Sequence, residues 1–360
     1  MKKVLFASTA LIATAGVAAA DSGVNFSGYG RFGIGYQEDR GVSPTGIPVG
    51  TFVTNTNTFI TAGGTVTTTT TSFSQTDISI TGVTDSDVSD TILVSRFRLN
   101  IDGFTETDGG VRFEARVRLQ ADEDSSTGEA NSAGLNGARF SVIYGGLRVD
   151  AGNVAGSFDN LANYYGNEVG LELFAGQYSG VNYNFLSYTS TGSGSNAVFF
   201  QYAVGDFAFG ASYDTNDAFD ADRWDISATY TFNNITAALA YGQTDGGDLF
   251  EDDPSLTVLT LGGEWGDFGG TLFVADDATE IDATDGTAWG LSASYNLGAA
   301  TTLLFTYGDG NADADLQQVA IGAIYDLGGG ASLRGGIGVN DCDICDGSQT
   351  VADFGAQFNF

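Results

Sequence analysis

Apolar and polar residues alternate along most of the chain, and this alternation limits the possible folds more than any other feature. In the stretch 24–36, Val24, Phe26 and Phe32 share one parity, whereas Asn25 and Arg31 share the other. Successive side chains of a β-strand point to opposite faces, so the pattern predicts a strand with one apolar and one polar face. No helical periodicity of convincing length occurs. The sequence therefore predicts an all-β fold.

The connections between the alternating stretches are of two kinds. Tight connections such as Gly145-Gly146, Gly205-Asp206 and Gly266-Asp267 alternate strictly with longer and mostly acidic ones. A meander in which every second turn is short has one smooth end and one looped end, as outer-membrane β-barrels do. We therefore predict sixteen antiparallel strands, near residues 24–36, 91–104, 110–121, 137–144, 147–153, 197–204, 207–213, 223–232, 235–242, 255–265, 268–275, 286–296, 301–307, 316–326, 331–339 and 349–360.

The start of the chain predicts export. Lys2 and Lys3 precede an apolar run, and Ala18-Ala19-Ala20 fits the small-residue cleavage site of a secretory signal peptide over 1–20. After residue 20, no eighteen consecutive residues are apolar, so we predict no transmembrane helix. Two classes remain, a soluble secreted β protein and a transmembrane barrel formed by residues 21–360.

The charge of the chain excludes several functions. The formal net charge is −32 and the chain has no His. Without the signal peptide, the 13 basic residues fall to 11 arginines against 45 acidic residues, which gives −34. Such acidity excludes general binding to nucleic-acid phosphates. The absence of His excludes a Ser-His-Asp or Cys-His mechanism and the commonest metal ligand, so we expect no enzyme.

Two long stretches lack the alternating pattern. Residues 37–90 are rich in Thr, Ser, Gly and Asp, and we interpret them as a long external loop with a hairpin of its own around Thr51–Thr81. Residues 154–196 join two predicted strands, and so long a connection in a compact domain is usually functional. Its charges are nearly all acidic, namely Asp159, Glu168 and Glu172. The alternative is an exposed loop without a special role.

The arginines are concentrated on the first five predicted strands and on their polar faces, as Arg31, Arg96, Arg98, Arg112, Arg116, Arg118, Arg139 and Arg148. If the hairpin after residue 104 turns at Thr107, Arg98 lies opposite Arg116 and Arg96 opposite Arg118. Directly opposed like charges destabilise a sheet. A register shifted by two, or splayed side chains on a solvated face, would remove the conflict. We favour a positive strip that faces Asp159, Glu168 and Glu172 across a water-filled hole.

Aromatic residues precede many of the tight turns. A ring with a polar tip suits the membrane interface, although aromatic residues are also common in ordinary strands. We interpret the repeated placement as a girdle at one end of a barrel, made of Tyr144, Tyr202, Phe232, Trp265, Tyr295 and Tyr325.

The cysteine pair and the acidic clusters are two further kinds of candidate site. Cys342 and Cys345 in an exported chain predict a small disulfide loop, and a metal site there would need more ligands. Acidic clusters could bind Ca²⁺ through oxygen ligands or bridge to anionic lipid, but none has the spacing of a Ca²⁺ loop. These clusters are Asp122-Glu123-Asp124, Glu251-Asp252-Asp253, Asp276-Asp277 and Asp313 with Asp315. We expect no other cofactor.

Three segments closely resemble the alphaproteobacterial general porins. They are SRFRLNIDGFTETDGGVRFEARVRLQADE (95–123), YDLGGGASLRGGIGVND (325–341) and VADFGAQFNF (351–360), whose Phe360 resembles the C-terminal signal recognised by the assembly machinery. The resemblance implies a homotrimer of sixteen-stranded barrels in which the third external loop, here 154–196, folds inward. It also implies a constriction with a basic wall made of Arg31, Arg96, Arg98, Arg116, Arg118 and Arg139. Arg112 and Arg148 lie closer to the tight turns and would sit below it.

The expected function is passive diffusion of small hydrophilic solutes and ions across an outer membrane, in contact with lipopolysaccharide and with weak cation preference. One alternative is a substrate-specific channel, which would need a solute track such as an aromatic slide of Tyr164, Tyr165 and Tyr178. A second alternative is a secreted acidic β-roll or adhesin, but the chain lacks the Gly-Asp nonapeptide repeats of a β-roll. An outer-membrane hydrolase is disfavoured because the chain has no His.

Overall fold

The computed structural model describes residues 22–40, 42–61, 64–85, 88–123, 129–214, 221–245, 253–345 and 347–360. In 42–61 and 64–85 it describes the backbone alone. The predicted signal peptide over 1–20 lies outside the described residues, as do Asp124, Glu251 and Asp252 of the acidic clusters. No helix in these ranges is long and apolar enough to cross a membrane.

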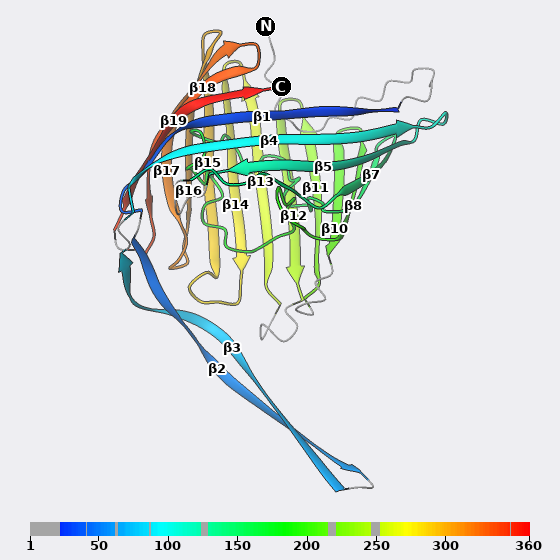
Figure 1. The fold of residues 1–360 in the computed structure, drawn as a ribbon, viewed down its shortest axis with the longest axis vertical. Coiled ribbons are helices and arrows are strands. Elements are labelled where there is room, and N and C mark those ends of the chain that lie inside the picture. Colours follow the sequence, from blue (N-terminus) through cyan, green and yellow to red (C-terminus); the bar gives the residue numbers. More distant parts are fainter. Residues whose placement is uncertain are drawn as a thin grey trace.

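The described chain consists of β-strands joined by turns and loops (Figure 1). The strands are β1 (Ser22–Gln37), β2 (Val42–Thr61), β3 (Gly64–Asp85), β4 (Thr91–Glu106), β5 (Arg112–Asp122), β6 (Gly134–Leu135), β7 (Arg139–Tyr144), β8 (Leu147–Gly152), β9 (Ala197–Val204), β10 (Phe207–Asp214), β11 (Arg223–Phe232), β12 (Ile235–Thr244), β13 (Ser255–Trp265), β14 (Phe268–Ala278), β15 (Gly286–Leu297), β16 (Thr301–Gly310), β17 (Gln317–Gly328), β18 (Ala331–Asp341) and β19 (Gln349–Asn359).

One antiparallel sheet of 17 strands closes on itself. β6 has two residues and only pairs with β5, so sixteen strands form the wall within the described residues. Neighbours in the wall are neighbours in sequence, except that β1 pairs with β4 on one side and with β19 on the other. The predicted sixteen-stranded antiparallel barrel is confirmed, and a secreted β-roll is excluded by this topology.

The barrel closes where the two ends of the sheet meet. β1 and β19 are antiparallel from Tyr29 opposite Asn359 to Gln37 opposite Val351. Beyond this ladder, the Gly28 N–H donates to the Phe360 carbonyl at 2.9 Å, and the Phe360 N–H donates to the Gly28 carbonyl at 3.0 Å. The Phe360 ring also stacks on Phe97 of β4, with ring centroids 5.9 Å apart. The predicted C-terminal signal is therefore also part of the seam of the barrel.

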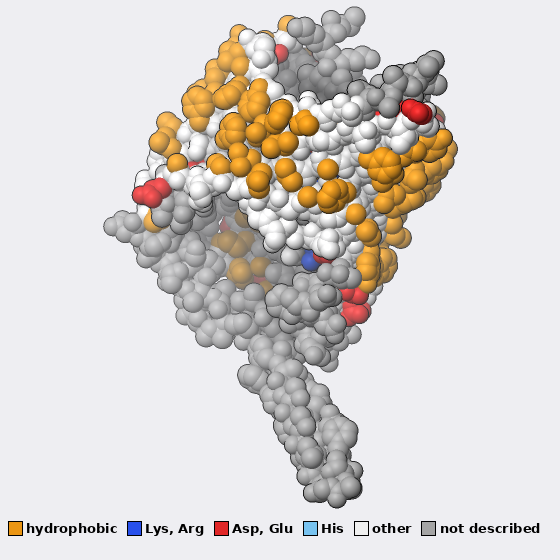
Figure 2. Space-filling view, turned by 45° about the vertical axis from the view of Figure 1, so that its right-hand side comes forward, with side chains coloured by type: hydrophobic (Ala, Val, Ile, Leu, Met, Phe, Trp, Pro, Cys, Tyr) orange, Lys and Arg blue, Asp and Glu red, His pale blue; other side chains and the backbone are white. Residues whose placement is uncertain are grey.

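The outer face of the wall is apolar, as the alternating pattern predicts. Val24, Phe26, Phe32 and Ile34 of β1 are exposed outside, and the same parity continues from strand to strand. Figure 2 shows hydrophobic side chains spread over much of this surface. The six predicted girdle residues, Tyr144, Tyr202, Phe232, Trp265, Tyr295 and Tyr325, are all exposed. An exposed apolar surface this extensive is expected of a protein that contacts lipid.

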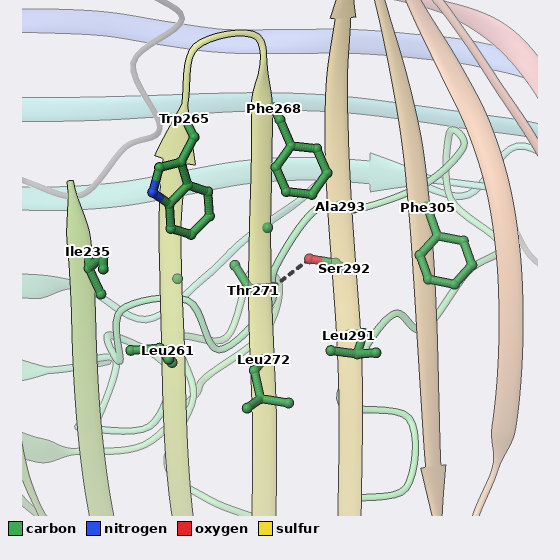
Figure 3. Close-up of a pocket in the computed structure, with 12 residues that line it drawn as sticks. Ile235, Leu261, Trp265, Phe268, Thr271, Leu272, Leu291, Ser292, Ala293 and Phe305 are labelled. Carbon is green, nitrogen blue, oxygen red and sulfur yellow. Dashed lines mark hydrogen bonds between the residues drawn. The ribbon is translucent and has the colours of Figure 1, made fainter.

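One shallow apolar depression interrupts the outer face of β12 to β16. It has a volume of about 410 Å³ and is lined by residues such as Gly270 and Ala293, whose small side chains leave the space. Trp265 and Phe268 flank it at the tight turn between β13 and β14 (Figure 3). This turn uses Gly266 with φ of 65°, a backbone conformation that L side chains rarely adopt.

The segment predicted as a long external loop contains a hairpin. β2 and β3 pair with each other from Val42 opposite Asp85 to Thr61 opposite Gly64, and they form a separate two-stranded sheet. Figure 1 shows this hairpin projecting from one end of the barrel. The predicted hairpin over Thr51–Thr81 was therefore correct in kind but too short.

The register predicted for the hairpin of β4 and β5 is wrong. Arg98 lies opposite Gln120 and Asn100 opposite Arg118, while Asp102 lies opposite Arg116. The connection extends over Thr107–Val111, where the Thr107 N–H donates to the Val111 carbonyl at 2.9 Å. A longer turn shifts the pairing, and this shift places a carboxylate or amide opposite each arginine. It therefore removes the like-charge pairs Arg98–Arg116 and Arg96–Arg118.

Candidate functional site

Residues 154–196, which we call the inner loop, connect β8 to β9 inside the barrel. Val154, Phe158, Tyr164, Leu171 and Leu186 of the loop are buried. They pack on the inner face of the wall, in clusters whose wall members include Val94, Phe199, Leu256, Phe273, Leu304 and Ala320. The apolar core of the molecule therefore lies between the inner loop and the wall, and the loop is not a free surface segment.

The loop follows the wall in one direction and then returns. On the outward pass, the Ser157 N–H donates to Asp225 of β11 at 2.9 Å and the Asn167 N–H donates to Ser292 of β15 at 2.8 Å. The loop reaches β19, β1 and β4 at Leu171–Leu173. On the return pass, the Gly176 N–H donates to Gln318 of β17 at 2.9 Å, and Asn182 and Tyr183 then contact Asp277 of β14. Leu186 lies again beside β9.

Asp353 of β19 holds the far end of the loop. Its carboxylate accepts the backbone N–H of Leu171 at 2.8 Å, of Glu172 at 2.7 Å and of Leu173 at 3.1 Å. Asp353 is buried, and a buried carboxylate needs such donors. Leu171 also accepts a 2.8 Å hydrogen bond from Arg31 through its carbonyl. The backbone around Glu172 is therefore fixed from both sides.

Small residues on the inner wall allow this close packing. A Cβ on Gly290 of β15 would lie 1.9 Å from the Gln177 carbonyl oxygen of the loop. A Cβ on Gly308 of β16 would lie 2.6 Å from the Gly176 carbonyl oxygen of the loop. Real Cβ atoms do not approach other atoms so closely, so glycine is required where the loop backbone touches the wall.

Glu172 lies between two arginines that the sheet places side by side. Arg31 of β1 is directly opposite Arg96 of β4. The Glu172 carboxylate is 2.6 Å from Arg31 and 2.5 Å from Arg96, and Arg96 also contacts Asp122. A carboxylate shared by two cations offsets the repulsion between opposed like charges. The acid predicted to face the basic wall across an open hole is therefore in direct contact with it.

The other predicted loop acids do not touch the arginines. Asp159 accepts hydrogen bonds from the Tyr165 hydroxyl at 2.5 Å and from the Tyr188 N–H at 3.0 Å, both within the loop. Glu168 is exposed. Tyr164, Tyr165 and Tyr178 pack against one another, with Tyr164 also against Phe273 of the wall. These tyrosines form packing for the loop and do not line a slide for solutes.

Most of the remaining wall arginines have a carboxylate partner on the wall itself. Arg116 binds Asp102 at 2.5 Å, and Arg112 binds Glu114 at 2.6 Å. The Asp150 carboxylate lies 3.0 Å from Arg148 and 4.0 Å from Arg139. These pairs neutralise much of the strip that was predicted from the sequence to be positive.

Arg98 and Arg118 differ from the other arginines of the strip. Within the described chain, neither lies within ion-pair distance of a carboxylate. Their Nε atoms donate to Gln120 at 2.5 Å and to Asn100 at 2.8 Å. Their terminal nitrogens converge on the Ser190 hydroxyl of the inner loop, at 3.3 Å for Arg98 and 2.8 Å for Arg118. Both side chains are half-buried.

Two tyrosines frame these cations. The Tyr29 ring of β1 lies 5.2 Å from the Arg98 guanidinium carbon, and the Tyr188 ring of the loop lies 4.6 Å from that of Arg118 and 5.5 Å from that of Arg139. Cations at such distances are attracted by the ring face. Tyr29, Tyr188 and Ser190 were not among the residues predicted from the sequence, and the two loop residues lie in a stretch without periodicity.

The remaining candidate sites lie away from this strip. Cys342 and Cys345 form a disulfide in the connection between β18 and β19. Asp276 and Asp277 follow each other on β14, so their side chains point to opposite faces. Asp315, in the connection after β16, accepts a hydrogen bond from Asn182 at 2.7 Å, and burial raises the pKa of its carboxyl. In the ranges that the structure describes, no group of three or more His, Cys, Asp or Glu converges on a possible metal position.

Comparison with known proteins agrees with this architecture. A family model described as Gram-negative porin matches residues 7–343. A porin of Fuscovulum blasticum is 28% identical over 356 residues, which cover 94% of this chain and 100% of the relative. A porin of Rhodobacter capsulatus is 29% identical over 284 residues, which cover 71% of this chain and 89% of the relative.

The solved structures agree as well. A mutant of the Rh. blastica porin superposes with a TM-score of 0.69 at 25% sequence identity, over 94% of this chain and 100% of that one. A second mutant of the same porin gives the same TM-score at 26% identity. The family model spans nearly the whole sequence, and this one chain forms both the barrel and the inner loop. The protein therefore belongs to the Gram-negative porin family.

Proposed function

We propose that the protein is a general diffusion porin, a passive channel for small hydrophilic solutes and ions. Membership of the Gram-negative porin family gives its location in the outer membrane. The observation that carries the proposal is the asymmetric interior. The inner loop covers the inner wall from β9 around to β1 and reaches β4, while Arg98, Arg116, Arg118 and Arg139 keep partly exposed side chains on β4, β5 and β7. A solute would pass between these cations and the part of the inner loop that packs on β12 to β15.

The charge balance supports weak cation preference. The chain carries 45 acidic residues, and acids such as Asp282, Asp313 and Asp343 are exposed in the connections between strands. A negative potential at the mouth raises the local concentration of cations. The arginines of the strip oppose this inside the barrel, so the net preference should be small.

Three further features belong to the same proposal. The chain would act without covalent chemistry, because it has no His and its pore needs none. It would assemble as a homotrimer, as its resemblance to the general porins implies. Its acidic outer connections would contact lipopolysaccharide, with Ca²⁺ bridging lipid phosphates and exposed carboxylates such as that of Asp313.

The competing function is a substrate-specific outer-membrane channel. An aromatic slide was one form of such a channel, but Tyr164, Tyr165 and Tyr178 are occupied in packing the loop. The observation that still favours some specificity is the pair of arginines Arg98 and Arg118, which converge on a neutral hydroxyl and have no carboxylate partner within the described residues.

Planar-bilayer recording and liposome swelling test the proposed function together. We expect ohmic conductance steps in multiples of three and swelling rates that fall smoothly as the size of a neutral sugar increases. Reversal potentials should show weak cation preference. Folded, detergent-soluble protein that neither conducts nor permits swelling would overturn the proposal. Swelling with one sugar only, at a rate that saturates, would favour the substrate-specific channel.

A further inference from the structure

Arg98 and Arg118 form an arrangement that is not needed to attach the inner loop to the wall. They lie on neighbouring strands, two positions apart in the register, because Arg98 pairs with Gln120 and Arg118 with Asn100. Each Nε is occupied by a neutral side-chain oxygen of the wall, which fixes the direction of the guanidinium group. Two positive charges then share one neutral oxygen atom, that of Ser190.

The acceptor that joins them is held rigidly. Asn136 donates to the Thr189 carbonyl at 2.6 Å and accepts the Arg118 backbone N–H at 2.7 Å. Asn153 donates to the same carbonyl at 2.8 Å and accepts the Thr189 N–H at 3.1 Å. The segment before Ser190 is thus fastened to the wall strand that carries Arg118. The convergence of the two guanidinium groups is therefore preorganised.

Within the described residues, no carboxylate balances the two guanidinium charges at Ser190, so this position favours an added anion. Between Arg31 and Arg96 the structure supplies a shared carboxylate, that of Glu172. At Ser190 the chain supplies a hydroxyl instead, which accepts hydrogen bonds but carries no charge. Arg139, whose Asp150 partner is 4.0 Å away and is shared with Arg148, adds a third weakly compensated cation against Tyr188.

We propose that Arg98, Arg118 and Ser190 form a binding subsite for a small oxyanion, of the phosphate or carboxylate type, on the wall of the pore. The proposal rests on the proposed channel function and assigns a solute class to one position in it. Arginine suits this role because its planar donors match the paired oxygens of phosphates and carboxylates. The exposed parts of both side chains give a passing solute access. An oxyanion would bind in transit, so phosphate should slow the flow of chloride and potassium.

The test is the conductance of the trimer in about 0.1 M KCl, titrated with inorganic phosphate at constant ionic strength and pH. At this salt concentration, screening leaves interactions within several ångströms largely intact. We expect a saturable fall in wild-type conductance. In the variant Arg98→Gln/Arg118→Gln, the phosphate concentration for half of the effect should rise at least tenfold, equivalent to about 1.4 kcal/mol. Acetate in place of phosphate tests the carboxylate type.

Two further variants serve as controls for the binding test. Arg112→Gln removes one arginine that lies toward the tight turn and is paired with Glu114, so it should leave the phosphate titration unchanged. Ser190→Asp keeps both arginines and supplies a tethered carboxylate between them, so it should abolish the saturable effect. Heat-modifiable migration in gels verifies that each variant folds.

Failure of this inference is distinguishable from failure of the channel function. A wild-type conductance that responds linearly to phosphate, while KCl conductance and sugar swelling are normal, would overturn the subsite and leave the porin function intact. A saturable response that persists unchanged in both the double variant and Ser190→Asp would also overturn it, because phosphate would then bind elsewhere.

Discussion

At the scale of single residues, the basic strip is mostly a set of compensated charges. The alternating pattern shows which faces the arginines occupy, but the partner of each one depends on the register and on the path of the loop. The contacts of Glu172 depend on both the register and the path of the loop. Asp353 fixes its backbone, and two opposed arginines bind its carboxylate. Removing one member of such a half-buried cluster leaves the others without compensation.

We predict that Glu172→Gln lowers stability and shifts selectivity toward anions. The change leaves Arg31 and Arg96 opposite each other without the shared carboxylate, which should cost about 1–3 kcal/mol. The stability is measured by thermal unfolding of the detergent-solubilised protein, and the selectivity by reversal potentials. Glu168→Gln is the matched control, since it removes the same charge from an exposed position in the same loop. It should change selectivity slightly and leave stability unchanged. Equal loss of stability in both variants would contradict the proposed role of Glu172.

At the scale of elements, the inner loop acts as the core of a barrel that would otherwise be hollow. Its apolar side chains cover the inner wall, while wall carboxylates and amides accept its backbone N–H groups. Buried backbone groups need such partners. The long stretch without periodicity therefore has order of its own, but that order comes from contacts with many strands and leaves no regular pattern in the sequence.

Much of the wall could be predicted from the sequence, whereas little of the loop could. Alternation reports the faces of strands directly, and the sixteen stretches correspond to the strands of the wall. The register of β4 and β5 could not be derived, because the turn around Thr107 is longer than assumed. The position of Asp353 on the inward parity of β19 was readable, but its three loop donors were not. Contacts between distant segments, such as Ser190 with Arg98 and Arg118, leave no local signal.

We predict that Gly290→Ala narrows the channel and destabilises it. The new methyl group would overlap the Gln177 carbonyl, so the return pass of the loop must move away from the wall and into the lumen. Overpacking of this kind costs about 1–3 kcal/mol. Conductance and the unfolding temperature should both fall. Gly270→Ala on β14 is the control, because its nearest neighbour, a Phe268 ring carbon, would be 3.5 Å away on the outer face. An unchanged conductance in Gly290→Ala would mean that the loop does not limit the flow.

At the scale of the whole molecule, two opposite charge distributions act over different distances. The net charge of −32 on the full sequence comes from acids spread over the chain, many of them in the connections between strands, whereas the arginines act on a solute within a few ångströms. Salt screens the acids of the connections and the arginines of the strip to different extents. The Debye length is about 10 Å at 0.1 M salt and about 3 Å at 1 M, so the distant acids lose their influence first. Selectivity should therefore depend on ionic strength.

We predict cation preference near 0.1 M KCl that disappears or reverses toward anions near 1 M KCl. The measurement is the reversal potential under a fixed concentration ratio at each mean salt concentration. A variant with Asp282→Asn, Asp313→Asn and Asp343→Asn removes exposed acids from connections between strands that carry no arginine of the strip, and it should weaken the preference at low salt only. A preference that is independent of salt in the wild type would place the selecting charges at the constriction itself. Glu168 would then be the carboxylate to test first, because it is the exposed acid of the inner loop.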